Sequence, residues 1–219
     1  ASSDYRQDMR ISKDMLGHLS QNYLKIRNTA RYILGNLFDF NPQTDKIAYT
    51  ELPELDKWAL MKLNELVAKV REGYDSYEFH TVFHTIHKFC VVDMSNFYLD
   101  VIKDRLYCDD TTGLSRRSAQ TAMYNILSAL VRMLSPILCF TADEIWQAMP
   151  HTEEDDIRNV AYNEMPAVDD SLAFSEEECE KWNKLTAFRD DVNNALEGAR
   201  TEKTLGKPPA ANVPVDATT

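Results

Sequence analysis

The sequence predicts an all-α protein, an up-and-down bundle of long helices with a short C-terminal helical extension. Apolar residues recur every three or four positions, glycine is scarce at 6 residues, and no convincing alternating strand pattern appears before the last few residues. This spacing places the apolar side chains of each helix on one stripe. Long helices bury such stripes by packing side by side.

Two helices are expected in the first part of the chain. The first should run over residues 12–37, with Ser12 as its N-cap, and Pro42 then enforces a loop. The second should run over 53–74, because proline suits the first turn of a helix. The apolar stripe of the first helix comprises Met15, Leu19, Ile26, Ala30, Ile33 and Leu37.

Two longer helices are expected next, and a shorter one near the end. The third should run over 76–107, and the fourth over 115–149 with a kink at Pro136. An acidic, irregular segment follows, and then a helix over about 175–203 and a frayed tail. We therefore expect a main helical domain over residues 1–165 and a C-terminal extension over 166–219.

The net charge of −11 argues against a nucleic-acid binder, because binding to a phosphate backbone uses clustered lysine and arginine. The distribution of the charge removes this objection. Residues 1–150 carry 17 basic and 19 acidic side chains, whereas residues 151–219 carry 7 basic and 16 acidic ones. The excess acid lies in the tail, so the bundle can still present a basic surface.

No uninterrupted apolar stretch reaches the roughly 18 residues that a membrane span needs, and the polar N-terminus lacks the apolar core of a signal peptide. We expect a soluble, cytoplasmic, monomeric protein without a membrane partner. The 4 cysteines form no CxxC pair, so we expect reduced and mostly buried thiols rather than a zinc ribbon.

Catalytic motifs are missing from the sequence, which lacks a GxSxG elbow, a glycine-rich phosphate loop and a recognisable catalytic cysteine. His80, His84 and His87 share one face of the third expected helix and leave a metal-dependent helical enzyme as an alternative. Their apolar neighbours favour partly buried, hydrogen-bonded histidines. We expect no catalytic residue and no bound metal.

The up-and-down topology gathers basic residues at one end of the bundle. The end of the first helix, the end of the third and the start of the fourth should meet there. Tyr23 precedes the arginines of the first helix on the same helix face. Arginine offers a planar fork to phosphate and a flat face to unstacked bases, which suits RNA loops. The alternative is a solvated surface on which nearby aspartates pair with the cations. The basic residues are Arg27, Arg31, Lys103, Arg105, Arg116 and Arg117.

Four segments carry a resemblance to a known family. They are 23–42 (YLKIRNTARYILGNLFDFNP), 96–107 (NFYLDVIKDRLY), 116–121 (RRSAQT) and 135–146, which begins SPIL and ends TADEIW. In these segments the sequence resembles the isoleucyl-tRNA synthetase family. Residues 2–12 are similar to its link from the catalytic domain, and 192–207 to the opening of its C-terminal extension.

This resemblance implies roles for the basic residues. By comparison with the methionyl branch, Arg27, Asn28 and Arg105 should read or stack on anticodon bases, although arginine replaces an aromatic residue at 105. The residues expected to contact tRNA phosphates are Tyr23, Arg31, Lys103, Arg116 and Arg117.

The resemblance also implies that residues 1–165 form an anticodon-binding domain that recognises the anticodon stem-loop of isoleucine tRNA. The parent enzyme would use ATP and magnesium to attach isoleucine, with catalytic and editing domains on the same polypeptide. This sequence has neither nucleotide-binding signature of the family and no cysteine-rich zinc module, so it should be inactive alone and bind no cofactor. A valyl or leucyl relative and a helical protein-interaction scaffold are the alternatives.

Overall fold

The computed structural model describes residues 1–8 and 11–201, which form helices, turns and loops without a strand in those ranges. The all-α prediction is confirmed. The chain divides into two compact units, Ala1–Ala173 and Phe174–Thr219, whereas the sequence suggested a boundary near residue 165. Within the described residues, no helix is long and apolar enough to cross a membrane.

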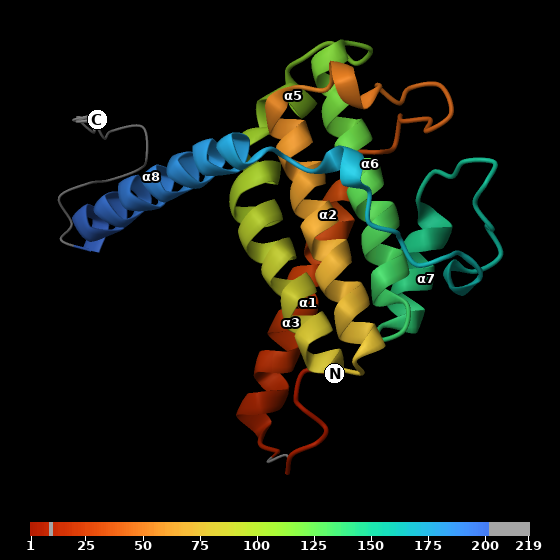
Figure 1. The fold of residues 1–219 in the computed structure, drawn as a ribbon, viewed down its shortest axis with the longest axis vertical. Coiled ribbons are helices and arrows are strands. Elements are labelled where there is room, and N and C mark those ends of the chain that lie inside the picture. The colour runs from red at the N-terminus through yellow and green to blue at the C-terminus, as the bar shows by residue number, and fades with distance from the viewer. Residues whose placement is uncertain (9–10, 202–219) are drawn as a thin grey trace. The chain divides into compact units, whose positions relative to one another are not determined.

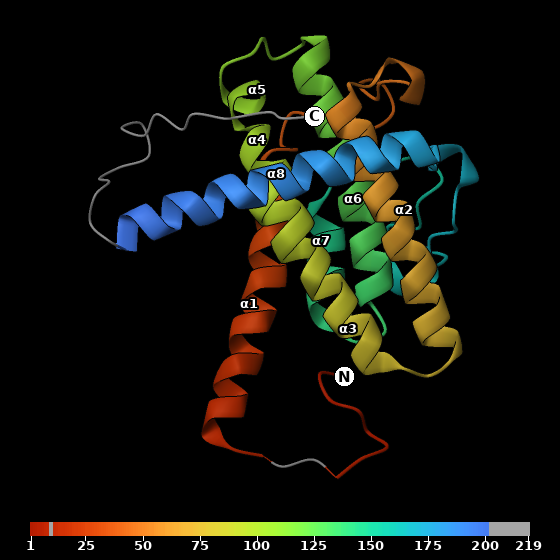
Figure 2. The same cartoon turned by 60° about the vertical axis from the view of Figure 1, so that its left-hand side comes forward.

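The first two helices begin close to where the sequence predicts. Helix α1 spans Lys13–Gly35, and the Ser12 side chain accepts a hydrogen bond from the Met15 amide as an N-cap. Helix α2 spans Glu54–Asp75 and follows Pro53. The predicted stripe of α1 is buried only from Ile26 onward, since Met15 is 39% exposed. Figure 2 shows why, because the first half of α1 extends beyond the other helices of its unit.

The helical path expected over 76–107 is present from Phe79 to Tyr107, but it is not one regular α-helix. The structure has α3 (Phe79–Lys88), a π-helix (Phe89–Tyr98), α4 (Leu99–Val101) and α5 (Lys103–Tyr107) in its place. Tyr77, at a φ of 59°, makes the tight turn that precedes α3. Gly73 allows α3 to approach α2, because a Cβ there would lie 2.7 Å from Cγ2 of Val82.

The kink predicted at Pro136 is a complete break. Helix α6 spans Leu114–Leu134 and α7 spans Cys139–Ala148. Pro136 has no amide hydrogen to continue the helix. The next two amides instead donate to the Leu134 carbonyl at 2.9 and 2.8 Å, which closes the last turn of α6. Short 3-10 turns lie at Tyr49–Glu51, Val160–Tyr162 and Asp170–Leu172.

Helices α1, α2, α3, α6 and α7 lie side by side in the first unit (Figure 1). Helix α6 is central, because its residues are buried on nearly all sides. Trp58 and Trp146 are buried as the sequence suggests, at 2% and 0% exposure. The cysteines are free, but only Cys90 is buried, while Cys108 and Cys139 are exposed, so the expectation of mostly buried thiols is wrong.

In the second unit, α8 spans Glu176–Thr201, within two residues of the helix expected over 175–203. Ser175 caps it by accepting a hydrogen bond from the Glu178 amide. The expected tail after this helix lies outside the described residues.

A buried ion pair joins α5 to the start of α2. The Asp56 carboxylate is fully buried and binds Arg105 through two hydrogen bonds, Nη1 to Oδ1 at 3.1 Å and Nη2 to Oδ2 at 2.6 Å. The Tyr98 hydroxyl donates to the same carboxylate at 2.7 Å. Because each of these groups would be costly to bury alone, the pair fixes α5 against α2.

We expect Asp56→Ala to lower the free energy of unfolding by about 3–5 kcal/mol, since it leaves the Arg105 charge part-buried and unpaired. Asp100→Ala is the control, because its ion pair with Lys103 is exposed at both partners. Urea unfolding followed by circular dichroism measures both. Equal stability of the two variants would contradict a stabilising role for the buried pair.

Candidate nucleic-acid interface

Three chain segments converge at one end of the bundle, the upper end in Figure 1, and we call this surface the basic pole. It comprises the end of α1 with the loop that follows, α5, and the start of α6. Arg116 joins all three, because its Nε donates to the Leu106 carbonyl at 3.1 Å and its Nη1 to Oδ2 of Asp39 at 2.6 Å. The predicted convergence of these segments is therefore observed.

Three of the predicted RNA contacts are engaged within the protein. Arg105 binds Asp56 and also donates to the side chain and carbonyl of Ser115 at 3.1 and 2.7 Å. The Arg116 side chain is only 6% exposed, and the Arg117 side chain 13%. Their donors therefore hold the pole together. Arg105 and Arg116 pair with aspartates in α2 and in the loop after α1. They do not pair with the aspartates close to them in the sequence, as the solvated-surface alternative would require.

Asp39 is the centre of this network. Its carboxylate accepts from Arg116 and from Gln120 Nε2, and its carbonyl accepts from Arg117 Nη1. Arg117 also forms an ion pair with Asp45 at 3.3 Å. Burial opposes the charge of Asp39, but the hydrogen bonds from Arg116 and Gln120 outweigh it and lower the pKa of the Asp39 carboxyl.

The remaining predicted residues differ in their surroundings. The side chains of Arg27 and Arg31 form no ion pair or hydrogen bond with residues 1–8 or 11–201, and Arg31 and Asn28 are exposed. Lys103 Nζ binds Asp100 at 2.7 Å, as the solvated-surface alternative suggests, but half of its side chain is exposed. The Tyr23 hydroxyl shares a hydrogen bond of 3.1 Å with Thr141 and ties α1 to α7.

A groove of about 660 Å³ crosses the basic pole, and we call it the outer groove. Two exposed aromatic side chains line it, Phe38 at 80% and Tyr107 at 64% exposure. Because residues 28, 31, 32 and 35 share one face of α1, this helix supplies a continuous wall. The lining residues are Asn28, Arg31, Tyr32, Gly35, Asn36, Phe38, Leu106, Tyr107 and Arg116.

A smaller hollow of about 270 Å³, which we call the inner hollow, lies between α1 and the π-helix. The Thr29 hydroxyl links these elements, because it lies 3.0 Å from Oγ of Ser95 and 3.3 Å from the Cys90 carbonyl. The lining residues are Lys25, Asn28, Thr29, Tyr32, Val91, Ser95, Asn96, Leu99, Asp100 and Lys103.

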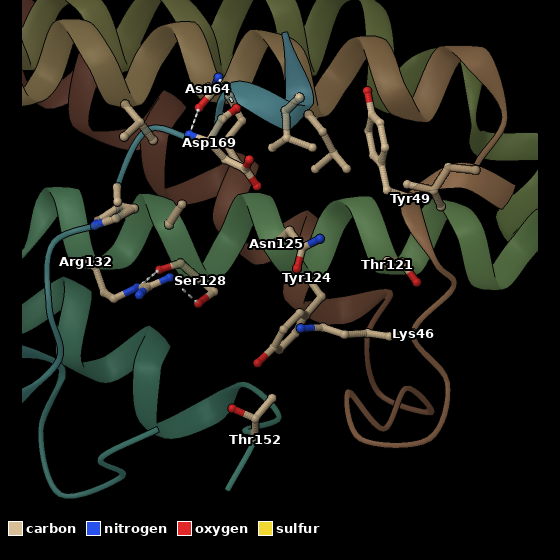
Figure 3. Close-up of a pocket in the computed structure, with 18 of the residues that line it drawn as sticks. Lys46, Tyr49, Asn64, Thr121, Tyr124, Asn125, Ser128, Arg132, Thr152 and Asp169 are labelled. Atoms are coloured by element: carbon tan, nitrogen blue, oxygen red, sulfur yellow. Dashed lines mark hydrogen bonds between the residues drawn. The ribbon is translucent and has the colours of Figure 1, made fainter. Parts of the chain in front are cut away.

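A third hollow, of about 460 Å³, lies between α2, α6 and two long loops, residues 36–53 and residues 149–173 (Figure 3). Lys46 Nζ lies over the Tyr124 ring at 4.7 Å from its centroid, and Arg132 Nε donates to the Ser128 carbonyl. Asn64 bonds the backbone of Asp169 in both directions and fastens the second loop to α2. Acidic side chains line this hollow together with the two cations. A polyanion would therefore be attracted to it less than to the basic pole.

The three histidines do not form a metal site. Among the residues that the structure describes, no group of three potential ligands is placed to hold a metal ion. His84 Nε2 lies 3.0 Å from the Ser2 carbonyl, which agrees with the hydrogen-bonded interpretation for this residue. His80 Nδ1 and His87 Nε2 are buried without a hydrogen-bond partner.

Sequence reasoning missed the aromatic residues of the outer groove. Phe38 and Tyr107 follow the ends of apolar stripes, where a sequence pattern does not distinguish a buried ring from an exposed one. Tyr32 carried a weak signal, because it is four residues after Asn28 and therefore shares its face of α1. A search for aromatic residues beside the predicted cations would have found Tyr32 and Tyr107, whereas Phe38 lies seven residues after Arg31.

Residues 56–214 match the family described as the anticodon-binding domain of tRNA ligases, and the chain belongs to this family. The isoleucine–tRNA ligase of Caldicellulosiruptor bescii is 51% identical over 94% of this chain and 22% of its own length. That of Caldicellulosiruptor saccharolyticus has the same identity and coverage, and that of Syntrophotalea carbinolica is 48% identical over 94% of this chain. The chain thus spans 22% of the length of these relatives.

The lowered pKa of Asp39 predicts a pH-dependent stability. A carboxyl whose pKa falls on folding stabilises the fold above its unfolded pKa of about 4, and this stability is lost as the pH falls through the folded pKa. Asp39→Asn should therefore destabilise the protein most at neutral pH and least in acid. Urea unfolding of both proteins between about pH 7 and pH 2 measures this. A constant difference across that range would contradict it.

Proposed function

We propose that this chain recognises the anticodon stem-loop of an isoleucine tRNA as part of an isoleucine–tRNA ligase. The observation that carries the proposal is the outer groove. There, exposed aromatic rings lie beside Arg31, whose side chain pairs with none of the described residues, in a domain of the anticodon-binding family. Single-stranded RNA is bound in this way, by a cationic surface that follows the backbone and by rings on which bases stack.

The proposal divides the predicted residues into two groups. Arg27 and Asn28 read bases, while Arg31 and Lys103 neutralise phosphates, because their side chains reach solvent or the grooves. Arg105, Arg116 and Arg117 use their donors on protein groups and position the pole, with Arg116 also forming part of the groove wall. Tyr23 supports α1 rather than lining either cavity.

For the full-length protein we propose the activity that the names of the relatives state, the ligation of isoleucine to its tRNA. ATP and magnesium would serve a catalytic domain on the same polypeptide, and an editing domain would accompany it. We further propose that the full-length protein is a cytoplasmic monomer. Among residues 1–8 and 11–201, no group of three potential ligands is placed to hold zinc.

Arg31→Ala should weaken binding of an isoleucine anticodon stem-loop and reduce the slope of log affinity against log salt by about 0.7 to 1. Arg27→Ala should also reduce discrimination against a methionine anticodon. Lys69→Ala is the matched control, since Lys69 is an exposed cation in the second half of α2, away from the pole. Fluorescence anisotropy at several salt concentrations measures each affinity. An equal effect of all three substitutions would contradict a localised site.

Gly35 offers a second test, because a Cβ at this position would meet no atom within 4 Å, yet the residue lines the outer groove. Gly35→Phe should fold normally and fill the groove, and so reduce affinity at least about tenfold. Gly17→Phe is the matched control, because Gly17 has the same free space in the same helix, about 27 Å away. Unchanged binding by Gly35→Phe would argue against the groove as the binding site.

A further inference from the structure

The outer groove and the inner hollow are neighbours that share two residues, Asn28 and Tyr32. Tyr32 lines both cavities and therefore lies on the boundary between them. The Tyr107 hydroxyl donates to the Tyr32 hydroxyl at 3.4 Å, and partial burial together with this contact raises the pKa of Tyr32. The ring is therefore held in place at one end of the boundary.

The two cavities differ in chemistry. Apart from Tyr32, the outer groove is flanked by the exposed rings of Phe38 and Tyr107, and aromatic faces accept any base by stacking. The inner hollow contains no other ring. Its polar side chains present both donors and acceptors, which suits hydrogen bonding to the edge of one particular base. These side chains are Lys25, Asn28, Thr29, Ser95, Asn96, Asp100 and Lys103.

The inner hollow is formed by an unusual stretch of backbone. The π-helix Phe89–Tyr98 supplies Ser95 and Asn96, and π-helical segments are rare and frequent at functional sites. Thr29 fastens this segment to α1 through Ser95 and the Cys90 carbonyl. The polar wall opposite Asn28 is thus fixed before any ligand arrives, which favours selective recognition.

We propose that Tyr32 separates two successive unstacked nucleotides of a single-stranded RNA loop, one in the outer groove and the other in the inner hollow. The base in the outer groove is held by stacking, with little regard to its identity. The base in the inner hollow is read through its edge, and Asn28 contacts both. This inference rests on the proposed function, because it assumes that the bound RNA is the anticodon loop.

The test combines abasic RNA with protein variants in double-mutant cycles. Each anticodon nucleotide of the stem-loop is replaced in turn by an abasic residue, and affinities are measured for three variants, Phe38→Ala, Asp100→Asn and Tyr32→Leu. Tyr32→Phe is the matched control, because it keeps the ring and removes only the hydroxyl contact. Thermal melting of each variant shows whether it is folded.

We expect two adjacent nucleotides to respond. Removing either base should weaken binding about tenfold. The loss of affinity at one abasic nucleotide should be coupled to Phe38→Ala, and the loss of affinity at its neighbour to Asp100→Asn. Both losses of affinity should be coupled to Tyr32→Leu, and neither to Tyr32→Phe. Replacing the base with a different base should lower the affinity more at the nucleotide coupled to Asp100 than at the nucleotide coupled to Phe38.

Coupling of Tyr32 to a single nucleotide, to two nucleotides that are not adjacent, or to none would overturn the arrangement while leaving anticodon binding intact. Failure of the proposed function gives a different result, because the unmodified stem-loop would then bind no better than an unrelated hairpin, or Gly35→Phe would bind as well as the parent chain.

Discussion

The basic pole depends on the cost of burying charge. The Asp56 carboxylate has no access to solvent and Asp39 little, and a buried carboxylate destabilises a fold unless a cation and hydrogen bonds compensate it. Arg105 and Arg116 meet this requirement with two hydrogen bonds each. These pairs fasten α5 to α2 and α6 to the loop after α1, and the bond from Arg116 Nε to the Leu106 carbonyl links α6 to α5. Of these segments, α5, α6 and the loop carry walls of the outer groove.

This use of arginine explains how an acidic chain can present the RNA-binding surface that we propose. Arg105, Arg116 and Arg117 are neutralised by aspartates inside the pole, whereas Arg27 and Arg31 remain unpaired among the described residues. The net charge of −11 is therefore a poor guide to the field at this surface. What an RNA loop would meet is a small number of exposed cations beside aromatic rings, held by a rigid frame.

The helices were largely predictable from sequence, because apolar spacing, the Ser12 cap and Pro53 are local signals. The π-helix was not predicted, and Pro136 predicted a kink where the structure has a complete break. The sequence predicted which basic segments meet at the pole, but not the ion pairs that they form there. Spacing cannot show that Arg105 turns inward to Asp56, 49 residues away, or that Phe38 remains exposed.

Two exposed thiols allow a direct test of the central claim that RNA binds at the basic pole. Cys108 follows Tyr107 in the pole, and Cys139 begins α7 at the other end of α6. The measurement is the rate of alkylation of each cysteine, by mass spectrometry, with and without a saturating isoleucine anticodon stem-loop. RNA bound at the basic pole should slow the reaction of Cys108 and leave that of Cys139 unchanged. Protection of Cys139 alone, or of neither thiol, would contradict it.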